Sequence, residues 1–226
     1  MAIKGFIFDF DGLILDTETP EYQAWQEVFQ LFGTDLPLDK WAQAIGSTIQ
    51  VFDPIDYLEI KTNQKINKKD LRSQHLARSL EIIYKQPVLP GVKKILLSAK
   101  EAGYRIGLAS SSSCEWVTSH LQRLGLLHFF EVIFGSDDVE QVKPNPELYL
   151  RAVTALDLKP DEAIAFEDSP NGIKAAKTAG LFCVAIPNDL TCQLNIQEAD
   201  LIISSFAEVT LTQILDSFYK TEKAKS

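Results

Sequence analysis

The sequence predicts a doubly wound α/β core with a parallel sheet and an α-helical segment inserted after the first strand. Short apolar runs alternate with helical patterns along most of the chain, which is the order typical of a parallel sheet with helices on both faces. The exception is the stretch from about residue 20 to residue 86, where helical patterns occur and no strand signal does.

Six runs have the nearly continuous apolar character of strands that are buried on both faces. The first is KGFIFD at residues 4–9, close to the start of the chain. The later strands are expected at residues 105–110, 131–136, 162–168, 181–186 and, as a short sixth strand, 200–204. Three of the helical patterns between them end at a glycine, which readily takes the left-handed conformation after a helix. These glycines are Gly103, Gly125 and Gly180.

The inserted segment has helical patterns at residues 21–32, 38–45 and 68–84. A loop-like stretch at Asp16–Thr19 marks its departure from the core, and Pro87 marks its return. The expected domains are an α/β core of residues 1–15 and 88–226 and an α-helical cap of residues 16–87. We expect the charged tail at residues 220–226 to be frayed.

Composition excludes several classes of protein. The net charge of −9 opposes binding to nucleic acid or to an anionic membrane surface. No apolar run reaches the ~18 residues of a membrane span, and the start of the chain lacks the features of a secretory signal. The three cysteines form no CxxC pair, which fits reduced thiols in the cytoplasm. We expect a cytoplasmic monomer, with a homodimer as the alternative.

Polar side chains follow four of the predicted strands. In open α/β sheets the ligand crevice lies at the carboxyl ends of the strands, so these side chains are expected to converge. They are Asp9 and Asp11 after the first strand, Ser110 and Ser111 after the second, Lys143 after the third, and Glu167 with Asp168 at the end of the fourth.

The four acids in this set need compensation. Two like charges 4 Å apart repel by about 4 kcal/mol at an effective dielectric near 20. Either some of the acids are protonated or a cation lies among them, and an all-oxygen site suits Mg²⁺. We therefore expect Mg²⁺ to be bound by the group Asp9, Asp11, Glu167 and Asp168.

The remaining strand ends offer donors for phosphate oxygens: the hydroxyl and backbone N–H groups near Ser110 and Ser111, and the ammonium of Lys143. We expect Pro144 and Pro146 to hold Lys143 in an extended segment. The chemistry that fits is attack by Asp9 on phosphorus to give an aspartyl-phosphate that water hydrolyses, with Asp11 moving the proton.

Four motifs, DFDGLILDTE, LASSS, VKPNPELY and FEDSPNGIKAAKTAG, occur in this order with the helical insertion after the first. The chain thereby resembles the haloacid dehalogenase (HAD) superfamily, most closely its β-phosphoglucomutase-like phosphatases. The resemblance implies a Rossmann-like core and a cap that closes over the substrate. It also implies site roles: Asp9 as nucleophile, Asp11 as general acid/base with its carbonyl on Mg²⁺, Ser110 and Lys143 on the phosphate, and Glu167 and Asp168 at the metal.

Two departures from the β-phosphoglucomutase pattern bear on the reaction. The cap-loop arginine that holds a second phosphate in those mutases is matched here by Ile49, and the lysine after their second motif is missing from Ser112–Cys114. These losses favour hydrolysis of a small phosphorylated metabolite. A phosphosugar mutase is the alternative. A non-enzymatic phospho-acceptor module is a third hypothesis, although such modules order their acids differently and carry no cap.

Several further residues receive weaker assignments. Glu18, Glu21 and the turn from Gly46 to Thr48 are expected to contact the substrate. Other polar and aromatic residues have structural interpretations: Asp16 and Thr17 as turn or capping residues, Ser169 as a helix cap, Trp25 and Phe29 as packing residues, His120 as a core or rim residue, and Asp137 with Asp138 as a helix start that could also support the metal site.

Overall fold

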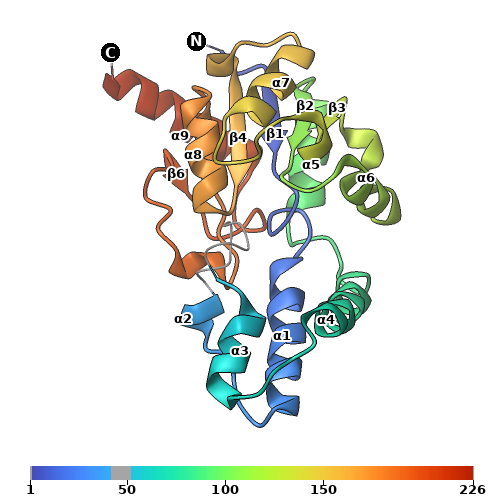
Figure 1. Ribbon diagram of the computed structural model, residues 1–226. Coiled ribbons are helices and arrows are strands. Elements are labelled where there is room, and N and C mark those ends of the chain that lie inside the picture. The colour runs from blue at the N-terminus through green and yellow to red at the C-terminus, as the bar shows by residue number, and fades with distance from the viewer. Residues whose placement is uncertain (1, 42–51, 226) are drawn as a thin grey trace.

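The computed structural model describes residues 2–41 and 52–225. Its strands form one parallel sheet in the order β3-β2-β1-β4-β5-β6 (Figure 1). The strands are β1 (Gly5–Phe8), β2 (Arg105–Ala109), β3 (Val132–Phe134), β4 (Ala163–Glu167), β5 (Phe182–Ala185) and β6 (Leu201–Ile202). Each lies inside a run that the sequence predicts as a strand, so the doubly wound fold class is confirmed.

Helices cover both faces of this sheet, and β1 shows why. Its alternate residues Phe6 and Phe8 are buried in one apolar cluster, whereas Ile7 is buried in another, because successive side chains of a strand point to opposite faces. The first cluster includes side chains of α5 (Val92–Glu101), α6 (Cys114–Arg123) and α9 (Leu211–Lys225), and the second includes those of α7 (Glu147–Ala155) and α8 (Pro170–Thr178).

The ends of the core helices agree with the sequence in most places. Gly103, Gly125 and Gly180 all have positive φ, as expected for residues that follow a helix. The expectation of a frayed tail is wrong up to residue 225, because α9 continues to Lys225. Phe218 anchors this helix by packing edge-on against Phe182, with ring centroids 5.2 Å apart. Short 3₁₀ turns fill the remaining connections: η1 (Leu127–Phe129), η2 (Ser136–Asp138), η3 (Pro160–Glu162) and η4 (Thr191–Gln193).

The inserted helices form a second body below the sheet in Figure 1. They are α1 (Glu18–Leu31), α2 (Leu38–Trp41), α3 (Pro54–Thr62) and α4 (Lys68–Ile83). This body has its own buried cluster, which includes Trp25, Phe29, Trp41, Ile55, Leu58 and Leu71. No helical pattern predicts α3, which begins at a proline and is capped by the Asp53 carboxylate. The division into a core and a cap at residues 15/16 and 87/88 stays a prediction.

Two chain segments join the bodies, and they run side by side. Leu15 pairs with Val88 in an antiparallel bridge, and the Leu89 N–H donates to the carbonyl of Ile14 at 2.9 Å. The outgoing segment begins with a tight turn at Gly12, whose φ of +76° favours glycine. Within the described residues, no helix is both long and apolar enough to cross a membrane.

Candidate active site

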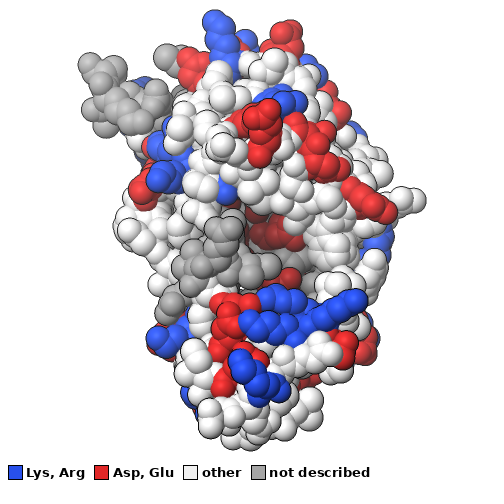
Figure 2. Space-filling model, viewed as in Figure 1, with Lys and Arg blue, Asp and Glu red and all other residues white. Residues whose placement is uncertain are grey.

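A cavity of about 460 Å³ separates the carboxyl ends of the strands from the inserted helices. Figure 2 shows the hollow between the two bodies, with acidic side chains inside it. The described residues that line it on the core side include Asp9, Asp11, Ser111, Ser112, Trp116, Lys143 and Asp168. Those that line it from the inserted segment include Thr17, Glu18, Glu21, Leu76, Ser79, Leu80 and Ile83. The cavity is therefore walled by both bodies.

Lys143 lies at the floor of this cavity between two acids. Its Nζ is 2.5 Å from Asp9 Oδ1 and 2.6 Å from Glu167 Oε1, and the lysine side chain is only 5% exposed. Carboxylate oxygens of Asp9, Glu167 and Asp168 all lie within 4.8 Å of one another. Three carboxylates against one ammonium leave an excess of two negative charges in this group.

The pKa values of the group reflect this imbalance. Burial, followed by repulsion from Glu167, raises the pKa of Asp9 well above its usual value. Burial and nearby acids raise the pKa of Asp168 in the same direction. Burial lowers the pKa of Lys143, but attraction to Asp9 and Glu167 outweighs that effect and raises it overall. The lysine therefore stays charged and only partly compensates the acids.

The donor set fits a divalent cation. All three members are hard carboxylate ligands, and their excess charge equals that of one Mg²⁺, which prefers oxygen ligands. Asp168 Oδ2 accepts only one described hydrogen bond, from Asn188 Nδ2 at 2.9 Å. The carboxylate of Asp11 is not in the group. Asp9, Glu167 and Asp168 are thus the carboxylates that would hold a metal here, and the expected metal contact of the Asp11 carbonyl stays a prediction.

Asp11 faces the loop between β2 and α6. Its Oδ2 accepts from the Ser112 hydroxyl at 2.7 Å and from the Ser110 hydroxyl at 3.2 Å. Its Oδ1 accepts from the indole Nε1 of Trp116 at 3.0 Å. Both oxygens of Asp11 are therefore held by neutral donors, and the carboxylate still borders the cavity.

The other sequence-predicted site residues have distinct positions. Ser110 is fully buried and is not among the cavity-lining residues, whereas Ser111 lines the cavity. Glu18 lines it and accepts from Asn188 Nδ2 at 3.2 Å. Gly46 and Thr48 lie outside the described residues, as does Ile49.

Lys143 reaches the site from a turn, so the expected extended segment is wrong. The Asn145 N–H donates to the carbonyl of Val142 at 3.1 Å and closes the turn, in which the Lys143–Pro144 peptide is cis. Pro146 then occupies the N-cap position of α7.

Two residues that sequence reasoning missed support the acids. Tyr149 is fully buried; its hydroxyl donates to Glu167 Oε1 at 2.5 Å, and its ring lies 5.1 Å from the Lys143 Nζ. Asn188 follows β5 and donates to both Glu18 and Asp168. The position of Asn188 after the fifth predicted strand is a signal that could have identified it. Tyr149 has the sequence pattern of an ordinary core residue of α7, so no such signal marks it.

The weaker structural assignments are largely confirmed. Ser169 caps α8 by accepting from the Gly172 N–H at 3.2 Å, and Asp16 accepts from the Thr19 N–H at 3.0 Å. Thr17 occupies the N-cap position of α1 without a side-chain bond. The residues expected to serve in packing are all buried: Trp25, Phe29 and His120.

Asp137 and Asp138 do not join the acids at the cavity floor. Asp137 accepts from the Cys114 N–H at 2.8 Å, and Asp138 accepts from the Gly135 N–H at 2.9 Å. They form a separate group with the Cys114 side chain. Their observed contacts are thus to the first residue of α6 and to the loop that follows β3.

Comparison with known proteins places this geometry in a family. The model of the family described as haloacid dehalogenase-like hydrolase matches residues 6–186. The chain is 48% identical to "Putative phosphatase YhcW" of Bacillus subtilis, over 95% of this chain and 97% of that protein. It is 31% identical to "Phosphorylated carbohydrates phosphatase" of Thermotoga maritima, over 79% and 82%. The crystal structure of β-phosphoglucomutase from Clostridium difficile superposes with a TM-score of 0.75 at 26% identity, covering 96% of this chain and 98% of that one.

Gly172 provides a test of how closely α8 approaches the buried acid. A Cβ at this position would lie 2.0 Å from Glu167 Cδ, so Gly172→Ala overpacks the site. Overpacking costs about 1 to 3 kcal/mol, and we expect the melting temperature to fall by about 2 to 12 °C. Lys174→Ala, on the exposed side of the same helix, is the control and should change little. An unchanged melting temperature for Gly172→Ala would contradict this packing.

Glu18 provides a test of the electrostatics of the cavity wall. Burial raises the pKa of Glu18 to about 8, so folding favours the protonated side chain. The stability that this preference contributes is fully present below the unfolded pKa of Glu18 and is lost as pH rises through about 8. Glu18→Gln in EDTA should therefore melt several degrees above wild type at pH 9 and close to it at pH 5. Glu198→Gln, at an exposed position, is the matched control. Equal differences at both pH values would show that burial does not perturb Glu18.

Proposed function

The chain belongs to the haloacid dehalogenase-like hydrolases and is a phosphatase of that family, and we propose that it hydrolyses a small phosphorylated metabolite through a phosphorylated Asp9. The observation that carries this proposal is the position of Asp9 at the floor of the cavity, bonded to the buried ammonium of Lys143. A carboxylate fixed beside a cation at a cavity floor is suited to attack an electrophile that carries negative charge.

The first step uses the oxygen of Asp9 that Lys143 leaves free. Lys143 binds Oδ1, so Oδ2 is the attacking atom. The bond from Oδ2 to phosphorus forms while the bond from phosphorus to the leaving oxygen breaks. An ammonium has three N–H donors, and among the described residues Asp9 and Glu167 accept two of them. The third can bind a phosphoryl oxygen.

Asp11 moves the proton in both steps. It protonates the leaving oxygen as the bond to phosphorus breaks, and as a carboxylate it then removes a proton from the water that attacks the phosphorylated Asp9. Its position supports this role, because it borders the same cavity as Asp9 and stands two residues further along the chain. The second attack releases phosphate and restores Asp9.

Other residues bind the transferred group and complete the site. Ser111 and the neighbouring loop after β2 line the cavity and can donate to phosphate oxygens. We propose Mg²⁺ as the cation held by the carboxylates of Asp9, Glu167 and Asp168 and by the carbonyl of Asp11; when bound, it would offset the repulsion between the carboxylates and the phosphate dianion. The inserted helices act as a cap that excludes water while the first step occurs.

The cavity wall favours a leaving group without a second phosphate. Among the described residues that line the cavity, Lys143 is the one cation. Residues 42–51, which are outside that description, contain no Lys, Arg or His in their sequence. Glu18 and Glu21 instead offer acceptors for hydroxyl groups. A phosphorylated sugar or polyol fits this wall, in keeping with the carbohydrate substrates in the name of the Thermotoga relative.

The remaining assignments concern the setting of the enzyme. We propose a cytoplasmic protein that acts on small molecules and binds neither nucleic acid nor membrane. The net charge of −9 supports this view, and so do the three free thiols of Cys114, Cys183 and Cys192.

The proposal is tested by phosphate release from p-nitrophenyl phosphate and a panel of sugar, polyol and nucleoside monophosphates in the presence of Mg²⁺. Asp9→Asn should lose activity at least about 10³-fold while its circular dichroism spectrum is retained. Asp161→Asn, at the opposite end of β4, is the control and should be fully active. Inactivity of wild type on the whole panel, or full activity of Asp9→Asn, would refute the proposal. Conversion of a sugar 1-phosphate to its 6-phosphate faster than phosphate release would favour the mutase.

Removal of the metal gives a second prediction. EDTA should abolish phosphate release, and added Mg²⁺ should restore it. Mg²⁺ at about 100 times its dissociation constant stabilises by about 2.7 kcal/mol, which corresponds to a rise of about 5 to 11 °C in melting temperature. Asp168→Asn should lose most of this rise. A rise that is equally large in Asp168→Asn would show that the cation binds elsewhere.

A further inference from the structure

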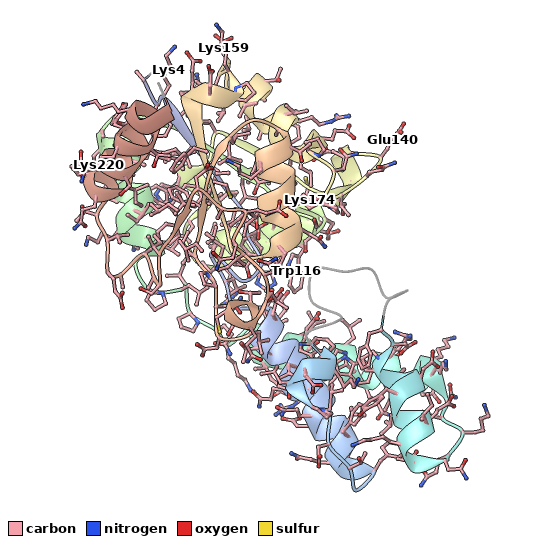
Figure 3. All side chains as sticks on the ribbon, turned by 90° about the vertical axis from the view of Figure 1, so that its left-hand side faces the viewer. Lys4, Trp116, Glu140, Lys159, Lys174 and Lys220 are labelled. Atoms are coloured by element: carbon pink, nitrogen blue, oxygen red, sulfur yellow. The ribbon has the colours of Figure 1, made fainter. Side chains whose placement is uncertain are left out.

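We propose that Trp116 is a positioning residue, which uses its indole N–H to fix the carboxylate of Asp11 for proton transfer. The inference rests on the role of Asp11 in the proposed function and extends it to a residue outside the motifs of the site. Figure 3 labels Trp116 where the α/β body faces the inserted helices, and its side chain lines the cavity.

The hydrogen bonds of Asp11 divide between its two oxygens. Ser112 and Ser110 both donate to Oδ2, whereas Trp116 Nε1 donates to Oδ1 at 3.0 Å. A carboxylate that is held at one oxygen alone can still turn about its χ2 bond, which has a broad torsional preference. The bond from Trp116 is the described contact that holds the second oxygen and thereby fixes the plane of the group.

The indole ring is itself held in place. It forms a T-shaped contact with the ring of His120, with centroids 4.2 Å apart, and His120 is 1% exposed. An η-nitrogen of Arg123 lies 3.3 Å from His120 Nδ1, and the same guanidinium donates to the carbonyls of Tyr84 and Gln86. Trp116 is therefore braced against the segment that returns from the inserted helices, and its single donor points in a fixed direction.

This arrangement has a consequence for chemistry. General-acid catalysis contributes most when the leaving oxygen is strongly basic, as in an alkyl or sugar alcohol, and least when it is a weak base such as p-nitrophenolate. Loss of the indole N–H leaves Asp11 in place but free to turn. The first step, which forms the phosphorylated Asp9, should then slow for alkyl phosphates and stay nearly unchanged for p-nitrophenyl phosphate.

The test compares Trp116→Phe with wild type on p-nitrophenyl phosphate and on the best alkyl phosphate of the substrate panel. Phenylalanine keeps an aromatic ring and removes the donor. We expect kcat/KM, which reports the first step alone, to fall about 10- to 100-fold on the alkyl phosphate, a part of the roughly 10²- to 10⁴-fold that acid–base catalysis contributes, and less than about 3-fold on p-nitrophenyl phosphate. Trp25→Phe is the matched control, because Trp25 stacks on His75 within the inserted helices, and its ratio of the two rates should equal that of wild type.

Asp11→Asn, measured in parallel, separates the possible failures. If it shows the leaving-group dependence and Trp116→Phe does not, the inference on Trp116 is overturned and the proposed function stands. If neither variant shows the dependence, the role of Asp11 in the proposed function is overturned as well. An equal loss of kcat/KM on both substrates in Trp116→Phe would assign the tryptophan to packing and also overturn the inference.

A spectroscopic measurement covers the case in which Trp116→Phe does not fold. The indole N–H resonance of Trp116 is followed by ¹⁵N-resolved NMR in wild type and in Asp11→Ala. We expect the resonance to shift and its hydrogen exchange to accelerate in the variant, while the resonance of Trp25 stays unchanged. An unaffected Trp116 resonance would show that the hydrogen bond to Asp11 is absent, which overturns the inference.

Discussion

The ammonium of Lys143 lies buried between the carboxylates of Asp9 and Glu167, and the organisation of the site depends on this contact. A buried charge is costly unless it is paired and hydrogen-bonded. One lysine cannot balance Asp9, Glu167 and Asp168 together, so ionisation of all three acids would leave an excess of two negative charges at the floor of the cavity. That excess is the physical reason to expect a divalent cation. Burial, followed by repulsion from neighbouring acids, raises the pKa values of Asp9 and Asp168.

The doubly wound sheet makes this contact possible because its participants follow different strands: Asp9 follows β1, Glu167 ends β4, and Lys143 lies in the turn between β3 and α7. β1 lies between β2 and β4, so the chain after β1 is flanked by the ends of both neighbours, which is where ligands bind in such sheets. Small residues then allow close approach. A Cβ at Gly12 would lie 2.2 Å from Asp168 Oδ2, and Gly12 also forms the turn that leads to the inserted helices. One glycine therefore serves both the acid group and the start of the cap.

The sequence predicts the parts of this protein that depend on pattern. The strands follow from continuous apolar runs, and the convergence of Asp9, Lys143 and Asp168 follows from the rule that parallel strands end at one edge. The supporting contacts could not be predicted in the same way. Tyr149 lies on the buried face of α7 like any core aromatic, and only the folded structure shows that its hydroxyl reaches Glu167. The turn at Lys143 was missed because two prolines suggest an extended segment, whereas a backbone bond between Asn145 and Val142 closes a turn.

The central claim is that Asp9 is the nucleophile that attacks phosphorus. Lys143 fixes the Asp9 carboxylate for that attack. A crystal structure of wild type with Mg²⁺ and beryllium trifluoride, a mimic of a phosphoryl group, tests this most directly. The account predicts beryllium bonded to the Oδ2 atom of Asp9, with the Lys143 ammonium beside a fluoride and the cation in contact with Asp168. Beryllium bonded to another carboxylate, such as Asp11 or Glu18, would contradict it.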